Sequence, residues 1–298
     1  MEPCVAAVGS FDGVHLGHRA IISRAIEIGR QKGLKTRAIT FLTHPLTVIA
    51  PHRAPMWAIP RSFSIRNLEE KFDEVSQLDF TPGLAKLTAR EFMALLKQRF
   101  NVDTLVMGYD NTFGSDCLSS REQYEAAGRD TGINVEFVDA VHCAEGRPLS
   151  SSRLRKAIAA WNSPEIEAVL GEYPVYTAKV VEGKHLGRKL GFPTLNVELT
   201  EDSVPLPDGV YAAITSLDKS EEGALAVLSV GNNPTVGDGK RSYELHVIDR
   251  DLPPMYGKKI SFTPFMKLRD IKKFDSLDEL KQAIRADILQ AKQLLANK

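Results

Sequence analysis

The chain has 298 residues, of which 43% are hydrophobic and 26% charged, and such near-average proportions exclude disorder as the dominant state. Lys plus Arg and Asp plus Glu each number 38, so the formal net charge is zero, which argues against a basic chain that coats nucleic acid. The longest apolar runs fall far short of the roughly 20 residues that a membrane span needs. At roughly 100–200 residues per domain, the length predicts two domains.

Strand-like runs alternate with helical runs through the first half of the chain. Ile21, Ala25 and Ile28 have the spacing of a helix, and Thr88 with Glu91 forms a capping box that opens another helix. The predicted strands cover residues 5–8, 36–41, 103–107 and 134–138. The helix that contains Ile21 covers residues 20–30, and a third predicted helix covers residues 119–127. This alternation predicts an α/β domain with an open parallel sheet covered on both faces, in which ligands bind beyond the carboxyl ends of the strands.

The second half of the chain has a different pattern. Two helices, over residues 152–161 and from Ser163, precede a boundary at residues 171–174, so we predict domains over residues 1–172 and 173–298. Short strand-like runs then predict a small antiparallel barrel or sandwich; they cover residues 175–181, 209–216, 224–230 and 242–248. A capped amphipathic helix after Ser276 ends the chain.

Residues 9–18 lie between the first predicted strand and the first predicted helix. Unpaired N–H groups at a helix N-terminus attract phosphate, and Gly13 and Gly17 allow the backbone to approach a ligand. His15 and His18 add two imidazoles that can donate hydrogen bonds to phosphate oxygens. A P-loop is excluded, because the chain contains no GxxxxGK[ST] motif. The segment favours a phosphate site, and the alternative is a plain strand–helix turn with two surface histidines.

This segment, Phe11-Asp12-Gly13-Val14-His15-Leu16-Gly17-His18, resembles the signature of the HxGH nucleotidyltransferases and, within them, the FAD synthetase (FMN adenylyltransferase) branch. The His44-Pro45 pair after a predicted strand and residues 149–155 at a predicted helix start resemble two further motifs of that branch. The resemblance implies a Rossmann-like domain in which His15, His18 and Arg155 stabilise the triphosphate. It also implies that ATP is held by Gly9, Phe11, Asp12, Gly13, Gly17, His44, Ser151 and Ser152. By position alone, the two serines are also candidates for helix N-caps.

One segment departs from the pattern of that branch. Gly108-Tyr109-Asp110 matches its Gly-x-Asp motif and makes Asp110 a candidate flavin-binding residue, but the basic residues that usually follow are missing from residues 111–117. Ser10 stands where Asn is common, and Thr43 stands where Pro is common. We therefore predict that the chain binds FMN more weakly than a relative with the basic stretch.

A second candidate site begins at Gly183. Glycines recur every four residues from Gly183 to Gly191 with basic residues between them, and a flexible basic loop can fold over phosphates. Thr194 and Asn196 follow two residues apart, so on an extended chain a hydroxyl and an amide oxygen could share one hard cation. The alternative is an ordinary basic hairpin loop.

The run Gly191-Phe192-Pro193-Thr194-Leu195-Asn196 resembles the riboflavin kinase signature, and residues 207–212, 230–235 and 243–246 resemble its later motifs in the same order. The resemblance implies that Thr194 and Asn196 bind Mg²⁺ and that Glu244 is the catalytic base. It further implies that the phosphates of ATP are held by Gly183, Gly187, Arg188, Gly191 and Pro193. Strand alternation independently directs Glu244 and His246 away from the core, towards a cleft or solvent.

Together the resemblances span almost the whole chain and imply a bifunctional flavokinase/FAD synthetase. Such an enzyme makes FMN from riboflavin and ATP with Mg²⁺, and then FAD from FMN and ATP. Three alternatives stay open: a kinase with a weakened or lost adenylyltransferase half, a transferase for another phosphate such as nicotinamide mononucleotide, and a non-enzymatic flavin-binding sensor or chaperone. Intact Thr194, Asn196 and Glu244 argue against the sensor.

The cellular setting follows from the cysteines and the N-terminus. Cys4, Cys117 and Cys143 are widely spaced without a Cys-x-x-Cys pair, which predicts free thiols in a reducing compartment. Residues 1–4 lack the pattern of a secretory signal. We therefore expect a cytoplasmic protein with small-molecule substrates and with neither a nucleic-acid nor a membrane partner. The sequence leaves the oligomeric state open.

Overall fold

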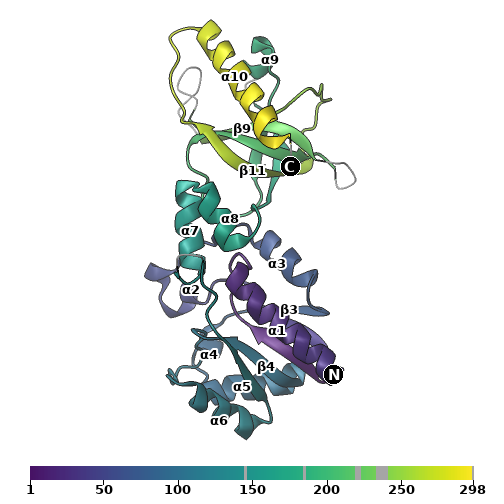
Figure 1. Ribbon diagram of the computed structural model, residues 1–298, viewed down its shortest axis with the longest axis vertical. Helices are drawn as coiled ribbons and strands as arrows, with labels where there is room; N and C mark the ends of the chain where they lie inside the picture. The colour runs from purple at the N-terminus through teal and green to yellow at the C-terminus, as the bar shows by residue number, and fades with distance from the viewer. Residues whose placement is uncertain (144–145, 184–185, 219–222, 233–240, 297–298) are drawn as a thin grey trace. The chain divides into compact units, whose positions relative to one another are not determined.

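The computed structural model describes residues 1–143, 146–183, 186–218, 223–232 and 241–296, and its contacts divide the chain into two compact units. The first unit consists of Met1–Trp57 and Arg61–Arg153, and the second consists of Ala58–Pro60 and Leu154–Lys298. Each unit contains its own sheet, and the two sheets belong to different architectural classes (Figure 1).

The first unit is built on a five-stranded parallel sheet with the strand order β3-β2-β1-β4-β5. Its strands are β1 (Cys4–Val8), β2 (Lys35–Phe41), β3 (Glu74–Leu78), β4 (Val102–Gly108) and β5 (Asn134–Val138). Its helices are α1 (Leu16–Lys32), α2 (Leu46–Ile49), the 3₁₀ turn η1 (Pro51–Arg53), α3 (Arg61–Glu69), α4 (Pro82–Ala85), α5 (Ala89–Phe100) and α6 (Arg121–Thr131). The predicted α/β domain with a parallel sheet is confirmed.

Helices cover both faces of this sheet, because successive side chains of β1 point to opposite faces. Cys4, Ala6 and Val8 face a core built with α5 and α6, and Val5 and Ala7 face a second core built with α1 and α3. Both cores are made of fully buried aliphatic and aromatic side chains. The sheet is therefore sealed along its length, and its carboxyl edge is where a ligand can reach the backbone.

The structure of this unit differs from the sequence prediction in several elements. The helical elements α2, η1, α3 and α4 were not predicted. Helix α1 begins at Leu16 rather than at residue 20, so its first turn contains Gly17 and His18. The edge strand β3 was not predicted, because its sequence, Glu-Val-Ser-Gln-Leu, mixes polar and apolar residues and only its last residue is buried. An edge strand pairs on one side only and does not need a continuous apolar run.

The second unit is a closed antiparallel barrel with the strand order β10-β7-β6-β11-β8-β9. Its strands are β6 (Tyr176–Val181), β7 (Leu195–Leu199), β8 (Gly209–Ser216), β9 (Ala224–Asn232), β10 (Arg241–Val247) and β11 (Lys259–Arg269), and the short helix α9 (Leu186–Leu190) precedes β7. The sequence predicted either a small antiparallel barrel or a sandwich, and the structure confirms the barrel. The terminal helix α10 (Leu277–Leu295) is also confirmed, and it packs against β8 and β9 (Figure 1).

Two helices, α7 (Ser151–Ala160) and α8 (Ser163–Leu170), connect the sheet-bearing segments in the sequence. From Leu154 onward their contacts group with the barrel. Trp161, at the end of α7, is buried and meets the ring of Tyr211 on β8 edge to face at 5.5 Å. Ile166, Val169 and Leu170 of α8 are fully buried. The predicted boundary at residues 171–174 stays a prediction.

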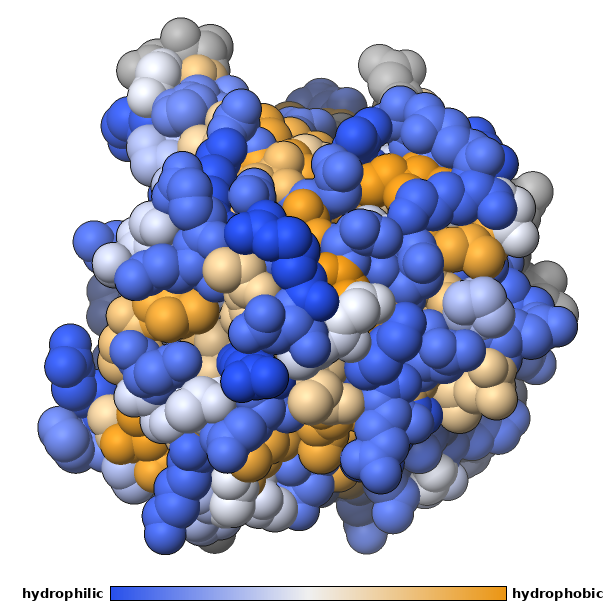
Figure 2. All heavy atoms as spheres, turned by 90° about the horizontal axis from the view of Figure 1, so that it is seen from below, coloured by the Kyte–Doolittle hydropathy of each residue, from blue (hydrophilic) through white to orange (hydrophobic). Residues whose placement is uncertain are grey.

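The surface of the described residues carries a few scattered apolar side chains. On the face shown in Figure 2, hydrophobic residues form small patches that hydrophilic residues separate. In the part of the chain that the structure describes, no helix is both long and apolar enough to cross a membrane.

The packing of α7 and α8 yields a test of the boundary. We expect a fragment of residues 173–298 to fold as a barrel with kinase activity, and a fragment of residues 151–298 to be more stable by about 2–4 kcal/mol, because it keeps Trp161 over Tyr211. Urea unfolding and FMN formation from riboflavin measure the two properties. If the fragment of residues 173–298 is insoluble or inactive while the fragment of residues 151–298 is active, the domain boundary lies at α7 and not at residues 171–174.

Candidate active sites

The turn over residues 9–15, hereafter turn 9–15, connects β1 to α1 at the carboxyl edge of the first sheet. The rings of His15 and His18 stack with their centroids 3.7 Å apart and their planes at 22°. Gly17 permits this stacking, because a Cβ at Gly17 would lie 3.1 Å from the His15 ring. The structure therefore brings the two predicted imidazoles together and explains the glycine between them.

The two stacked histidines differ in their surroundings. Phe11 meets His18 edge to face at 5.4 Å, and Arg61 lies within electrostatic range of His18. Burial lowers the pKa of His18 well below its ordinary value, and the nearby charges of His15 and Arg61 lower this pKa further. His18 is therefore neutral at neutral pH and acts as a hydrogen-bonding group rather than as a cation.

The start of α7 reaches the same turn. The hydroxyl of Ser151 donates a hydrogen bond to the carbonyl oxygen of Asp12 (3.0 Å). The hydroxyl of Ser150 accepts a hydrogen bond from the N–H of Arg153 (3.3 Å). This is an N-cap contact, which the sequence had suggested for Ser151 or Ser152 instead. Ser152 is exposed, and Arg155 lies four residues after Ser151, on the same face of α7.

A cavity of about 800 Å³ opens beside this turn within the first unit. Gly9 and His44 both line it, which places the second predicted motif next to the first. The rest of the wall is mainly apolar and aromatic; it includes Phe41, Phe80, Leu84, Leu87, Phe92 and Phe113. Asp110 is exposed and lies outside the set of lining residues, whereas the adjacent Asn111 belongs to it.

Residues 111–117, in which the sequence lacks the expected bases, contribute to one side of this cavity, and several hydrogen bonds hold them in place. Asn111 donates from its amide to the carbonyl of Val8 (2.8 Å), and the Tyr124 hydroxyl bonds both the N–H and the carbonyl of Phe113. The carboxylate of Asp116 accepts a hydrogen bond from the N–H of Ala89 (2.8 Å), at the first turn of α5. The polar residues of this stretch thus anchor the cavity wall.

The predicted glycine loop of the barrel is partly helical, because α9 covers Leu186–Leu190, and its glycines lie directly against the two predicted cation ligands. A Cβ at Gly183 would lie 2.0 Å from the amide nitrogen of Asn196, and a Cβ at Gly187 would lie 2.3 Å from the carbonyl oxygen of Phe192 and 3.1 Å from the hydroxyl of Thr194. These contacts require glycine at both positions. Lys184 and His185, within the predicted loop, lie outside the described residues, as do Asn233, Pro234 and Thr235 of the later turn motif.

His246 is a residue whose contact the sequence prediction did not include. Its Nδ1 lies 2.8 Å from the carbonyl oxygen of Pro193 and so fixes the residue before Thr194. Its ring also meets Phe192 edge to face at 6.0 Å. Strand alternation indicated the direction of His246, but only the fold shows which carbonyl it meets.

Glu244 lies opposite Asn196 in the register of β10 and β7. Directly opposed residues of antiparallel strands share a face, so the carboxylate and the amide point to the same side of the barrel. Two cavities in this part of the barrel have Thr194 as a common lining residue. One, of about 120 Å³, is lined by Glu244, Thr194, His246 and residues of α10, and the other, of about 60 Å³, is lined by Thr194, Asn196, Arg188 and Tyr256.

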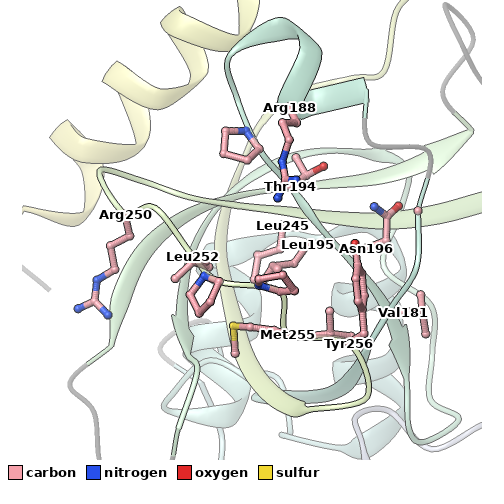
Figure 3. Close-up of a pocket in the computed structure, with 15 residues that line it drawn as sticks. Val181, Arg188, Thr194, Leu195, Asn196, Leu245, Arg250, Leu252, Met255 and Tyr256 are labelled. Atoms are coloured by element: carbon pink, nitrogen blue, oxygen red, sulfur yellow. The ribbon is translucent and has the colours of Figure 1, made fainter.

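Thr194 lines both of these cavities. In the view of Figure 3, Arg188 and Thr194 lie at the upper edge of the smaller cavity, and Met255 and Tyr256 lie at its lower edge. The oxygen donors of Thr194 and Asn196 are the kind that a hard divalent cation prefers, and the missing Cβ of Gly183 leaves room for the Asn196 amide. The residues present therefore fit Mg²⁺. Gly191 borders the loop at a positive φ of 88°.

Comparison with known proteins assigns the two units to known domain families. Residues 1–153 match the family model of FAD synthetase, and residues 170–295 match that of riboflavin kinase. Together these matches define a chain with one nucleotidyltransferase domain and one flavin kinase domain.

Relatives match over nearly the full length. The chain is 35% identical to the bifunctional riboflavin kinase/FMN adenylyltransferase of Pseudomonas fluorescens over 98% of this chain and 93% of that protein. It is 34% identical to the protein of the same description from Escherichia coli K12, again over 98% and 93%. A crystal structure described as a macrolide-efflux protein from Streptococcus pneumoniae superposes with a TM-score of 0.85 at 30% identity, covering 100% of this chain and 95% of that one. The chain belongs to the family of bifunctional riboflavin kinases/FMN adenylyltransferases.

The glycine contacts in the barrel lead to a prediction. Gly183→Ala pushes a methyl group into the Asn196 amide, so we expect FMN formation to fall roughly 10- to 100-fold and the Mg²⁺ concentration for half-maximal activity to rise. Gly257→Asn is the matched control, because Gly257 is a barrel glycine with no assigned role, no atom lies within 4 Å of a Cβ there, and Asn tolerates its positive φ of 79°. Unchanged kinase activity in Gly183→Ala would contradict the role of this contact.

Proposed function

We propose that Glu244 is the general base of riboflavin phosphorylation in the barrel, and that turn 9–15 with His18 forms the nucleotide site of FMN adenylylation in the first unit. The chain is an enzyme with both activities, by its membership of the bifunctional family. This membership also favours FMN over the alternative acceptor phosphates and an enzyme over a sensor. One observation supports the kinase site most: Thr194 stands between a cavity that contains Glu244 and a cavity that contains Arg188 and Asn196.

In the kinase reaction, the larger barrel cavity would hold riboflavin. Phe274, Leu280 and Ile284 give it an apolar side. Arg269 also lines it and binds the buried Asp287 of α10 through both carboxylate oxygens. The smaller cavity would hold the nucleotide, with Arg188 towards its phosphates. Phosphoryl transfer would then take place at Thr194, which lines both cavities.

Glu244 would accept the proton of the ribityl hydroxyl as that oxygen attacks the terminal phosphate. Thr194 and Asn196 would hold Mg²⁺, which supplies neutralising charge to the phosphates when bound. Gly183, Gly187, Gly191 and Pro193 would let the backbone close over the phosphates. His246 contacts the carbonyl oxygen of Pro193 and would thereby hold the backbone next to Thr194 in place beside these glycines.

In the adenylylation reaction, the phosphate of FMN would attack the α-phosphate of ATP in line and release pyrophosphate. ATP would lie against turn 9–15, where Gly9, Phe11, Asp12, Gly13 and Gly17 bring the backbone close. His15 and His18 would donate hydrogen bonds to the triphosphate, with His44, Ser151 and Ser152 around it. Because His18 is neutral, fixed positive charge would come from Arg155. The apolar cavity of about 800 Å³ would take the flavin ring, with Asp110 at its margin.

We expect Glu244→Gln to reduce FMN formation by about 10²- to 10⁴-fold, because the amide cannot accept the proton. Adenylylation of supplied FMN should be unchanged, since Glu244 lies in the barrel. Incubation with riboflavin, ATP and Mg²⁺, followed by chromatographic separation of riboflavin, FMN and FAD, measures both steps. Kinase turnover within a few-fold of the unmodified protein would remove Glu244 from the role of base.

We expect the chain to adenylylate FMN but to bind FMN weakly, because residues 111–117 supply no basic side chain. Each charge-assisted hydrogen bond contributes roughly 1.5–3 kcal/mol to binding. Restoring one charge should therefore lower the Michaelis constant for FMN by about tenfold. Thr112→Arg is suitable, because Thr112 is exposed and lines the cavity, whereas Asp116→Arg would break the contact with Ala89.

Thr112→Gln, of similar length and no charge, is the control for that experiment. The Michaelis constant for ATP should stay nearly unchanged in both variants. Equal constants for FMN in the Arg and Gln variants would show that other residues already place the FMN phosphate. Undetectable FAD in all three proteins would favour the kinase with a lost adenylyltransferase half.

A further inference from the structure

The turn that carries the first site is conformationally unfavourable. Phe11 and Val14 have positive φ angles of 45° and 47°, and Gly13 has one of 87°. For a β-branched residue such as Val14 this conformation is an outlier. Strained residues of this kind persist only where surrounding contacts over-determine them, and they cluster at functional sites. Turn 9–15 must therefore be held by its neighbours.

Helix α3 provides two of the contacts that hold the turn. Arg61 Nη1 donates to the carbonyl oxygen of Ser10 at 2.9 Å, and the hydroxyl of Ser64 accepts a hydrogen bond from the N–H of Gly13 at 3.2 Å. Arg61 and Ser64 are three residues apart and so project from one face of the helix. Their contacts with the turn lie on either side of Phe11 and Asp12: Arg61 is a donor to Ser10, and Ser64 is an acceptor from Gly13.

Arg61 also connects the turn to the neighbouring strand and its loop. Its Nη2 donates to the hydroxyl of Thr40 and to the carbonyl of Phe41 (3.1 Å), at the end of β2. Its guanidinium lies over the ring of Trp57 at 4.6 Å, and Trp57 in turn lies 5.3 Å from His44. One planar side chain with several donors thus joins the ends of β1 and β2 and the loop that carries His44.

We propose that Arg61 and Ser64 of α3 are positioning residues of the adenylyltransferase, which hold turn 9–15 in the shape that presents its backbone, His15 and His18 to the nucleotide. Neither residue has to touch the substrate for this role. The inference deepens the proposed function, because it rests on the assignment of the nucleotide site to this turn.

The two residues should act as one unit, because both restrain the same backbone stretch. A misplacement of about 1 Å can lower a rate 10²-fold, so we expect Arg61→Met to reduce kcat for FAD formation roughly 10- to 100-fold and Ser64→Ala to reduce it less. The double variant should lose less than the product of the two single losses. Michaelis constants should change by no more than about threefold, because the bound groups are still present.

The experiment uses the full chain with FMN, ATP and Mg²⁺. Arg66→Met is the matched control, because Arg66 is an exposed arginine on the same helix, and we expect it to leave FAD formation unchanged. Arg61→Lys should recover part of the lost kcat, since an ammonium can still bond the Ser10 carbonyl. The kinase activity of each variant reports the amount of folded barrel, and thermal unfolding followed by circular dichroism reports the folded fraction of the whole chain.

Several results would overturn the inference. FAD formation by Arg61→Met within about twofold of the unmodified protein would do so, and so would a raised Michaelis constant for ATP with unchanged kcat. A loss that equals the unfolded fraction, or that multiplies independently between the two single variants, would also overturn it. His18→Ala separates this inference from the site assignment: if FAD formation survives that change, the site assignment fails, whereas if it is lost and Arg61→Met is active, only the inference fails.

Discussion

A loop that presents its backbone to a phosphate has few side chains of its own to hold it, so its shape must be imposed by neighbouring groups. In each unit of this chain, neighbouring groups hold such a segment in place, but the kind of contact differs between the two units. In the first unit, α3 grips a turn with strained residues through Arg61 and Ser64. In the barrel, the glycine loop is seated on the side chains of Asn196 and Thr194, and His246 holds the Pro193 carbonyl from the opposite strand. The groups that would do chemistry are thus carried by segments with little freedom.

The sequence predicted features that depend on residues close together in the chain, and it missed features that depend on contacts between residues far apart in the chain. Strands such as β1 and β4 are buried apolar runs and were predicted, whereas the half-exposed edge strand β3 was not. The pair His15 and His18 and the pair Thr194 and Asn196 were candidates because their spacing is local. Arg61 was not, because its partner Ser10 is 51 residues away and nothing in the residues around Arg61 reveals that contact. Local spacing indicates chemistry, but the support for that chemistry is a property of the tertiary fold.

Residues 111–117 show why a departure from a family pattern needs a structural interpretation. The sequence alone presents them as a stretch that has lost its bases. In the fold, Asn111 and Asp116 use their polar groups to join β4 to β1 and to the start of α5, and Phe113 contributes to an apolar wall. At about 25 cal/mol per Å² of buried apolar surface, about 100 Å² of additional burial of the flavin ring offsets one missing charge-assisted contact. A largely apolar cavity can therefore compensate for part of the lost charge.

The stacked pair of histidines imposes a last restriction on the adenylylation chemistry. Two imidazolium ions with centroids 3.7 Å apart would repel each other strongly, and Arg61 adds a further positive charge on the side of His18. The pair therefore cannot neutralise a triphosphate by becoming doubly protonated. It can offer N–H donors in a fixed direction, and a neutral donor keeps that function as the pH rises above neutrality. Under the proposed function, charge neutralisation would come from Arg155 and from the cation that accompanies ATP, so that hydrogen-bond direction and charge would be supplied by different groups.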